Sequence, residues 1–416
     1  MREDILIIGA GAAGLIAARQ MSDQYNVTIL EALDRPGGRI QSLHTPGTGR
    51  LIEAGPEFIH GQLPITMQLL KEAGINHVPV EGRMYRCHHG EWEEQTEMIA
   101  GWDELIDKME QEPTDMSLLA LLEKCFSAKK YEELRQQALR FAEGFDVADT
   151  YKISIKSLAR EWSAQPGGNF RIPAGYQSVI DFLVESCCAK NVQIKFHQRV
   201  TDIHWETDRV RVTTRGGNSF HASKVVITVP IHILQESAGK YALHFHPALP
   251  LYHDAARYIG MGPVIKMILQ FNKRCWRDDA SFILGEGEIP TWWSPLPDQT
   301  PVLTGWAGGA AAKRLIHCSQ EELLQIGLGS LSRILAVDVS TLTDALVESA
   351  VYNWRNGAYT YSMPGSESAR AFLRTPVQDT IFFAGEGVYS GEASGTVEAA
   401  FASGMEAAEK ILAIHA

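Results

Sequence analysis

The residue types best suited to chemistry near the start of the chain are three glycines and one glutamate. Gly9, Gly11 and Gly14 form a GxGxxG pattern between a strand-length apolar run and a helix-forming stretch. Such glycines permit a tight turn, let backbone approach a pyrophosphate, and let the helix pack closely on a sheet. Glu31 ends the next strand-like run, where a carboxylate can accept hydrogen bonds from a ribose diol. The pattern predicts a dinucleotide site with its phosphates at a helix N-terminus.

A second residue with chemical potential is Lys266, the one cation within the apolar run 264–271. Burying an ammonium group costs free energy unless the group has a partner or a role. We therefore expect Lys266 to take part in a reaction. The alternative is a lysine that points outward from an alternating strand.

Composition limits the classes of function. The chain has 416 residues, 45% hydrophobic and 21% charged, which suggests an ordered protein of two or three domains. Its formal charge of −12 argues against binding to nucleic acid. Apolar stretches are too short for a signal peptide or a membrane span, so we expect a cytoplasmic protein that does not contact membranes. Six cysteines without CxxC spacing predict free thiols, no disulfide framework and no metal site.

The elements that must position these residues follow from periodicity. A strand, glycine turn, helix and strand open the chain, a mostly helical insertion follows over 62–190, and strand-like runs return at 192–205, 210–214 and 225–229. A buried strand at 381–384 and a small-residue helix at 396–414 close the chain. The predicted helices between these regions span 65–73, 117–126 (after a start signal at Thr114 and Asp115), 131–143, 176–188 and 319–335. We therefore predict a discontinuous nucleotide domain (1–75, 190–238 and 373–416) and a substrate domain (76–189 and 239–372).

The residues after Glu31 favour a flavin. Gly37 and Gly38, with Arg35 and Arg39, can bring further N–H groups and guanidinium charge to a pyrophosphate. This run resembles the flavin-containing amine oxidase family, which includes monoamine oxidases, polyamine oxidases, L-amino-acid oxidases and lysine-specific histone demethylases. The resemblance implies FAD and an α/β, two-domain fold, in which a discontinuous Rossmann-type FAD-binding domain joins an α+β substrate domain with a mixed sheet and a helical insertion.

Further landmarks of that family follow in order along the chain. The segment 53–61 resembles its second glycine motif, 171–176 the opening of a helix, and 383–386 its C-terminal flavin motif. Val200 matches a position that contacts adenine through backbone. The cofactor-binding residues that the resemblance implies are Gly9, Gly11, Ala13, Gly14, Glu31, Ala32, Gly37, Gly38, Arg39, Val200, Gly385, Glu386, Thr396 and Val397.

The resemblance also implies a reaction. A hydride passes from the carbon bearing a primary or secondary amine to flavin N5, the imine is hydrolysed, and O2 reoxidises the flavin to give H2O2. Lys266 then reaches N5 through a water, and Tyr359 forms an aromatic wall for the amine. Thr396 stands where monoamine oxidases have a second aromatic wall, and His60 lies near the amine. Ala358 replaces the cysteine that attaches flavin in monoamine oxidases, so the FAD is expected to be noncovalent.

Four functions remain open on these residues. A small polyamine or monoamine, with O2, is the favoured substrate, and Glu57 is a candidate pocket carboxylate for it. An L-amino-acid oxidase would need an arginine for the substrate carboxylate, for which Arg83, Arg86 and Arg171 are available. A desaturase or protoporphyrinogen-type oxidase generally lacks the lysine strand. A flavin-bound protein with vestigial activity and a partner-binding role is the fourth, and the oligomeric state stays open. Trp292, Trp293 and Trp306 are interpreted as core residues rather than pocket residues.

Overall fold

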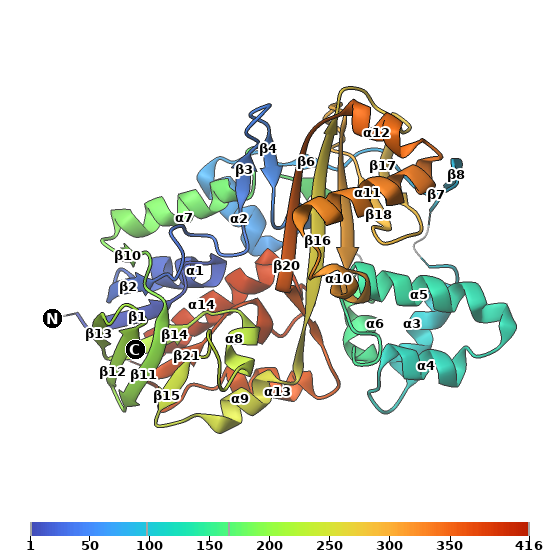
Figure 1. Cartoon of the computed structure of the whole chain (residues 1–416). Helices are drawn as coiled ribbons and strands as arrows, with labels where there is room; N and C mark the ends of the chain where they lie inside the picture. Colours follow the sequence, from blue (N-terminus) through green and yellow to red (C-terminus); the bar gives the residue numbers. More distant parts are fainter. Residues whose placement is uncertain (1, 97–98, 165–166, 415–416) are drawn as a thin grey trace.

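A parallel sheet forms the centre of one lobe. The computed structural model describes residues 2–96, 99–164 and 167–414, and Figure 1 shows this lobe carrying both chain ends. Its five strands have the order β10-β2-β1-β14-β21, with every neighbouring pair parallel. The strands are β1 (Asp4–Ile8), β2 (Asn26–Leu30), β10 (Gln193–Lys195), β14 (Lys224–Ile227) and β21 (Ile381–Phe383). They come from the three segments that the sequence assigns to the nucleotide domain, whose exact boundaries stay a prediction.

Both faces of this sheet are covered, which explains why β1 is continuously apolar. Ile5 and Ile7 pack against helices on one face, whereas Leu6 and Ile8 pack on the other face beneath a four-stranded sheet of order β13-β12-β11-β15. The helical layer comprises α1 (Ala12–Met21), α2 (Pro64–Ala73), α7 (Gln177–Ala189) and α14 (Val397–Ala413). The opposite layer comprises β11 (Val200–Glu206), β12 (Arg209–Thr214), β13 (Ser219–Ala222), β15 (His244–His246), α8 (Ile231–Gln235), α9 (Pro250–Ala256) and α13 (Ser366–Leu373).

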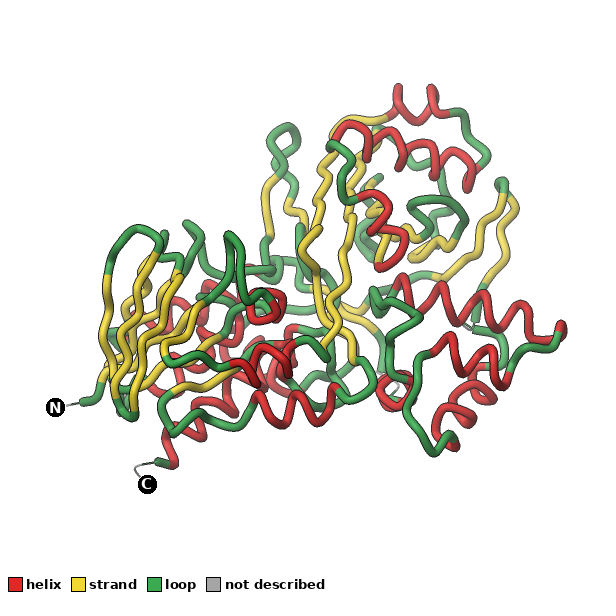
Figure 2. The backbone as a smooth tube through the Cα atoms, turned by 60° about the horizontal axis from the view of Figure 1, so that its bottom comes forward, coloured by secondary structure: helices red, strands yellow, loops and turns green. Residues whose placement is uncertain are grey.

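A seven-stranded mixed sheet forms the other lobe, in the order β20-β16-β19-β18-β17-β7-β8. Two of its strands are long, and Figures 1 and 2 show them running from the first lobe up into the second. The strands are β7 (Arg83–His88), β8 (Glu91–Glu94), β16 (Ile259–Phe271), β17 (Ala280–Leu284), β18 (Thr291–Trp293), β19 (Val302–Gly308) and β20 (Leu346–Ser362). The helices beside them are α10 (Gly309–Leu315), α11 (Gln320–Leu335) and α12 (Val339–Ala345).

The alternation of β16 decides which way Lys266 faces. Ile265, Met267 and Leu269 lie in the core beneath α11, whereas Ile268 lies in a separate cluster on the other side. Because successive side chains of a strand point to opposite faces, Lys266 points away from α11. A capping box at Ser319 and Glu322 fixes the start of α11, so the helix covers that face in one register.

The predicted helical insertion is confirmed in part. A helical cluster has its own core around Leu105, Leu121 and Leu158. Its elements are α3 (Trp102–Gln111), α4 (Leu118–Cys125), η1 (Lys129–Tyr131), α5 (Glu132–Gly144) and α6 (Ile155–Ser163). The start signal at Thr114 and Asp115 was wrong, because Ser117 caps α4 and the Asp115 carboxylate instead accepts hydrogen bonds at the start of α6.

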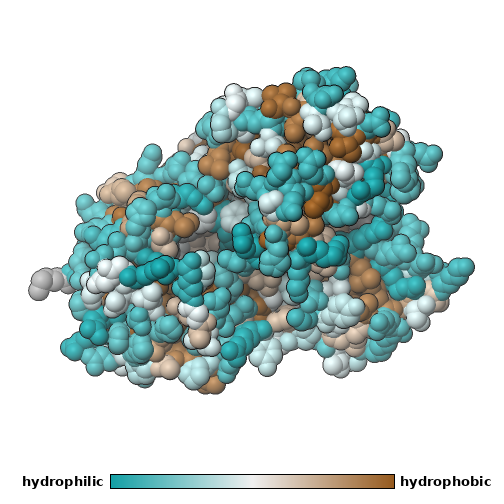
Figure 3. All heavy atoms as spheres, in the orientation of Figure 1, coloured by the Kyte–Doolittle hydropathy of each residue, from teal (hydrophilic) through white to brown (hydrophobic). Residues whose placement is uncertain are grey.

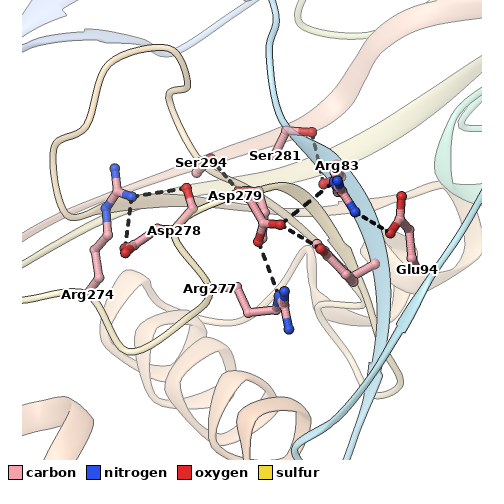
Figure 4. A network of polar contacts seen from close by, with 10 residues as sticks. Arg83, Glu94, Arg274, Arg277, Asp278, Asp279, Ser281 and Ser294 are labelled. Atoms are coloured by element: carbon pink, nitrogen blue, oxygen red, sulfur yellow. Dashed lines mark hydrogen bonds and ion pairs between the residues drawn. The ribbon is translucent and has the colours of Figure 1, made fainter.

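The same region also supplies the β7–β8 hairpin to the second sheet, which the helical prediction missed. Figure 4 shows how Arg83 joins the hairpin to its neighbour strand. Arg83 Nη1 lies 2.7 Å from Glu94, and its carbonyl accepts a hydrogen bond from Ser281 of β17. Cross-strand contacts of this kind hold an otherwise short hairpin at a sheet edge.

One strand prediction needed correction, and one long strand was missed. The run 192–205 divides into β10 and β11, which belong to different sheets, and His197 between them has a positive φ of 57°. β20 was not predicted at all, because its charged and aromatic residues give no simple alternation. The remaining elements of the described residues are five short strands, β3 (Ser42–His44), β4 (Leu51–Glu53), β5 (Ile59–His60), β6 (Val78–Pro79) and β9 (Asn169–Arg171), and the 3-10 turn η2 (Glu386–Val388).

The surface, the helix lengths and the cysteines bear on whether the chain could bind a membrane or a metal. Hydrophilic residues predominate on the face in Figure 3, with hydrophobic ones in small scattered groups. Among the described residues no single helix has the length and apolarity to cross a membrane; α11 and α12 pass that test only as a pair bent by 116°, and α11 is a core helix here. All six cysteines are free, and the described part of the chain holds no cluster of three or more potential metal ligands.

Candidate active site

One cavity of about 1990 Å³ brings the predicted site residues together. It runs from the glycine turn at the end of β1, past β16 and β20, to the helical cluster. Of the predicted residues, all but Gly14 line it: Gly9, Gly11, Ala13, Glu31, Ala32, Gly37, Gly38, Arg39, His60, Val200, Lys266, Tyr359, Gly385, Glu386, Thr396 and Val397. Small-ligand pockets usually measure about 300–1,000 Å³, so this one has room for a dinucleotide and a substrate.

The glycine turn has the geometry that its pattern predicts. Gly9 has a φ of 112°, a conformation that would be strained for any residue with a side chain. The N-cap of α1 is Gly11, so no side chain caps the first turn of the helix. The first N–H groups of α1 are therefore available to a ligand. Gly14 serves packing, since a Cβ there would lie 2.0 Å from the Gly9 carbonyl oxygen. It supports the turn from behind, as expected of the third glycine, and does not line the cavity; its contact with the cofactor stays a prediction.

Glu31 is buried at the end of β2 and already tied to backbone. Its carboxylate accepts hydrogen bonds from the N–H of Ala10 at 2.7 Å and of Leu33 at 2.8 Å. These bonds aim the carboxylate into the cavity, and its remaining lone pairs can accept from a diol. Ala32 lies beside it on the cavity wall.

The two arginines after Glu31 have different roles. Arg35 donates to the carbonyls of Pro36, Gly38 and Ile40 and so shapes the loop; it also lines the cavity, and its predicted role toward a pyrophosphate stays a prediction. Arg39 pairs with Glu386 at 3.0 Å and also lines the cavity.

The C-terminal motif is held from two sides. The second oxygen of Glu386 accepts from the N–H and the hydroxyl of Thr360, each at 2.6 Å. The N–H of Gly385, whose φ is 126°, donates to the Ser403 hydroxyl. Thr396 is the N-cap of α14, with its hydroxyl donating to the Ala393 carbonyl and accepting from the N–H of Ala399. The Thr396 hydroxyl is thus occupied with capping, and its neighbour Val397 begins the helix.

The cradle fits FAD. Uncapped N–H groups of α1, the close-approach position Gly11, the aimed carboxylate of Glu31 and the Arg39 guanidinium meet along one wall. Val200, the first residue of β11, also lines the cavity. A side-chain nitrogen of His232 in the same wall is buried without a partner among the described residues, as expected of a wall that faces a polar ligand.

Lys266 lies on the cavity wall and is 1% exposed. Its Nζ donates to Glu57 at 2.9 Å and to the Gly55 carbonyl at 3.1 Å, and it lies 5.7 Å from the ring centroid of Trp293. The outward-facing alternative is therefore wrong. An ammonium has three donors, so one N–H remains for a molecule in the cavity.

Glu57 is the anion that compensates this burial. Its other oxygen accepts from Trp293 Nε1 at 3.0 Å and lies 3.2 Å from Arg171 Nε. Although burial alone would raise it, the pKa of Glu57 is lowered by Lys266 and Arg171 together. The neighbouring Glu53 accepts hydrogen bonds from the Ser42 hydroxyl and the Tyr176 N–H, but burial outweighs these bonds and the Lys266 charge and raises its pKa to about 7.

An aromatic group lines the cavity beyond Lys266. Trp306 lies opposite Lys266 in the β16–β19 ladder and is stacked near Tyr359, with centroids 6.4 Å apart and planes at 22°. The Tyr359 hydroxyl donates to the carbonyl of Phe145. Trp293 and Trp306 therefore line the cavity, whereas Trp292 is a core residue as expected.

His60 is an uncharged member of this aromatic group. Its Nδ1 lies 2.9 Å from the Asn169 amide oxygen, and its ring meets Phe145 edge-on. Burial lowers its pKa, so the imidazole is neutral near pH 7 and adds no positive charge beside an amine.

Two acidic residues that the sequence did not single out complete the far end. Asp146 is 8% exposed and accepts from Trp162 Nε1, and Glu161 accepts from the Ser157 hydroxyl. Both line the cavity. Within the described chain Asp146 has no cationic partner, and burial together with the charge of Glu161 raises its pKa well above its usual value. Asp146 lies on a loop and Glu161 on a helix, and both are far from Lys266 in sequence. No sequence pattern could therefore have assigned them to the same site.

Comparisons with known proteins agree with the geometry. The family model for flavin containing amine oxidoreductases matches residues 12–412. Polyamine oxidase 2 of Arabidopsis thaliana is 29% identical, over 97% of this chain and 87% of its own, and lysine-specific histone demethylase 1B of Mus musculus is 27% identical, over 99% and 53%.

Two solved structures share the fold. A putrescine oxidase bound to putrescine superposes with a TM-score of 0.81 at 22% identity over 99% of both chains. The cyclohexylamine oxidase of Brevibacterium oxydans IH-35A also gives 0.81, at 20% identity over 100% of both chains. With its cavity, its lysine strand and a family match over almost its whole length, this chain belongs to the flavin containing amine oxidoreductase family.

Proposed function

We propose that this protein is an FAD-dependent oxidase of polyamines or diamines that releases H2O2. FAD held noncovalently along the glycine turn would supply the two-electron acceptor for the hydride of the amine-bearing carbon. The imine that results takes up water, and O2 accepts two electrons and two protons. The chain's own residues bind the cofactor, orient the amine and exclude water.

The observation that carries this proposal is the single cavity that joins a dinucleotide cradle to a buried lysine and an acidic end. Tyr359 and Trp306 offer parallel aromatic faces, which attract and orient an ammonium group. Ala358 lies on the same wall and has no sulfur through which a flavin could be attached.

The acidic end favours a substrate with a second cation. Asp146 lies near enough to Tyr359 to raise the pKa of that phenol further after burial has raised it, and Glu161 acts on Asp146 in turn. An ammonium group at this pair would compensate the burial that now opposes ionisation of Asp146. A monoamine would leave Asp146 without a cation, so a diamine or polyamine fits better.

Of the three arginines named for an amino-acid substrate, Arg86 lines the cavity, whereas Arg171 and Arg83 are engaged in other contacts. Arg171 donates to the carbonyls of Leu296 and Ser294 and pairs with Glu57, while Arg83 pairs with Glu94 at the surface. These contacts do not support a carboxylate-binding role for either.

An anaerobic flavin-reduction screen tests the proposal. Purified enzyme is mixed with putrescine, spermidine, benzylamine or L-leucine, and flavin absorbance is followed before and after O2 is admitted, with peroxide detection. We expect putrescine or spermidine to bleach the flavin fastest. Bleaching by none of these amines would contradict the proposed activity and favour a binding role, and fastest bleaching by L-leucine would favour an amino-acid oxidase.

A further inference from the structure

The environment of Lys266 contains one carboxylate that bridges two cations. Glu57 lies between Lys266 of β16, at 2.9 Å, and Arg171 of β9, at 3.2 Å, and Trp293 of β18 donates to it as well. The Arg171 guanidinium also lies over the Phe58 ring, 4.7 Å from its centroid. Three elements therefore fix the position of this carboxylate.

The charges around Lys266 make Glu57 the decisive counter-charge. The charged or titratable groups that face the ammonium are Glu57 and Arg171, together with Glu53 of β4. Asp298 acts on Arg171 from outside the group. Because burial keeps a proton on Glu53 up to about pH 7, Glu57 is the carboxylate that stays ionised throughout the neutral range.

We propose that Glu57 is a positioning residue, which fixes the Lys266 ammonium at the cavity wall, keeps it charged, and so makes reoxidation of the bound flavin by O2 independent of pH. A positive charge beside a site that delivers electrons to O2 favours the negative charge that develops on oxygen. Without Glu57, a buried ammonium beside Arg171 would lose its proton more readily. The inference deepens the proposed function and rests on it for the identity of the cofactor.

The first test follows reoxidation without any amine. Enzyme reduced photochemically under anaerobic conditions is mixed with O2 from about pH 7 to about pH 9, for wild type, Glu57→Gln, Trp293→Phe and Lys266→Met. Glu57→Gln is made together with Glu53→Gln, so that no second carboxylate ionises beside the ammonium within this interval. We expect a flat wild-type profile and a fall of about tenfold for Glu57→Gln over that interval. Lys266→Met should be slow at every pH, and Trp293→Phe, which removes a hydrogen bond but no charge, should keep a flat profile.

An arginine rescue separates charge from structure. The double variant Glu57→Gln with Lys266→Arg carries a guanidinium that stays protonated over the whole interval. We expect its profile to be flat again. A Glu57→Gln profile as flat as that of wild type, or a double variant as steep as Glu57→Gln alone, would overturn the proposal.

A second measurement needs neither flavin nor activity. Thermal unfolding of the apoprotein is compared for Glu57→Gln, Lys266→Met and a second double variant, which combines Glu57→Gln with Lys266→Met. In this measurement "double variant" means that combination. Removing one partner of a buried ion pair leaves an uncompensated charge, so the double variant should unfold at a higher temperature than Glu57→Gln. If Glu57→Gln does not fold, recovery of soluble protein in the double variant gives the same answer, and no recovery contradicts the pairing.

These readouts are distinct from the test of the proposed function. A wild-type flavin that no amine bleaches would refute the amine oxidase activity while the O2 profiles still report on Glu57. Conversely, flat profiles in every variant would refute the role of Glu57 and leave amine oxidation untouched.

Discussion

At the scale of single residues, the partners of four buried carboxylates explain why their pKa values shift in opposite directions. Glu57 has two cations beside it, and its pKa is lowered. Glu53, Asp146 and Glu161 are opposed mainly by burial, and their pKa values are raised. Desolvation acts on all four, and the pKa falls only at Glu57, where two cations outweigh it.

Asp146 should set the preference for substrates with a second ammonium group. We expect Asp146→Asn to raise the KM for putrescine by about tenfold, which corresponds to about 1.4 kcal/mol, because a charge-assisted contact is lost. The KM for benzylamine should change by less than about twofold. Asp149→Asn is the control, since Asp149 pairs with Lys152 outside the cavity. Equal effects on both substrates would argue against an ammonium site at Asp146.

Glu53 should make the apoprotein less stable as pH rises. Its folded pKa of about 7 lies above the unfolded value, so its contribution is fully present below about pH 4.5 and is lost as pH rises through 7. The loss amounts to about 3 kcal/mol. Thermal unfolding at pH 5 and at pH 8 should show a larger fall in midpoint for wild type than for Glu53→Gln; identical falls would contradict the assignment.

At the scale of elements, a side chain of α14, in the C-terminal segment, caps the N-terminus of α2, in the N-terminal segment. α2 begins at Pro64 after Leu63, which cannot cap it. Glu398 of α14 instead accepts from the N–H groups of Ile65 and Thr66, and from the Thr66 hydroxyl at 2.7 Å. Gly404 lets α14 approach α1, because a Cβ there would lie 2.3 Å from the Ala13 carbonyl oxygen. The cradle for the cofactor depends on both contacts.

Removal of the Glu398 carboxylate should therefore destabilise the nucleotide lobe. We expect Glu398→Ala to cost about 3 kcal/mol, since two N–H groups and a hydroxyl lose their acceptor in a buried place. Thermal unfolding of the apoprotein measures this change. Glu409→Ala, on an exposed position of the same helix, should alter the midpoint little, and an equal effect from both variants would exclude the capping explanation.

At the scale of the whole molecule, the cavity is walled by segments from both ends of the chain and from the long strands between the lobes. β16 and β20 extend from the first lobe into the second and carry Lys266 and Tyr359 (Figure 1). A cofactor in this cavity would contact the glycine turn, the C-terminal motif and β16 together. Binding of one ligand would therefore stabilise both lobes together.

Removal of FAD should lower the unfolding temperature of the entire chain. A ligand at 100 times its Kd stabilises the folded state by about 2.7 kcal/mol, so the midpoint should rise with added FAD. Scanning fluorimetry of apoprotein across a series of FAD concentrations measures this dependence. A midpoint that does not change with FAD would contradict binding to the folded state, and FMN is the control because it lacks the adenosine half.

The sequence alone predicted the features of the protein that depend on local backbone conformation. The GxGxxG turn, the strand before it and the helix after it follow from glycine conformations and short-range periodicity, and Lys266 stands out because a charge in an apolar strand requires compensation. Landmarks in fixed order then pointed to the family. The packing role of the third glycine, Gly14, follows from the same spacing, since a Cβ there would lie 2.0 Å from the Gly9 carbonyl oxygen.

Only the tertiary structure decided which groups meet. Glu57 and Lys266 are 209 residues apart, yet their atoms lie 2.9 Å apart, and Arg171 reaches the same carboxylate from a third segment. Asp146 and Glu161 became candidates for substrate binding only when the structure showed how burial excludes water from them. Compensation of a buried charge depends on distance in space and on exclusion of solvent, and neither quantity is written in the order of residues along a chain.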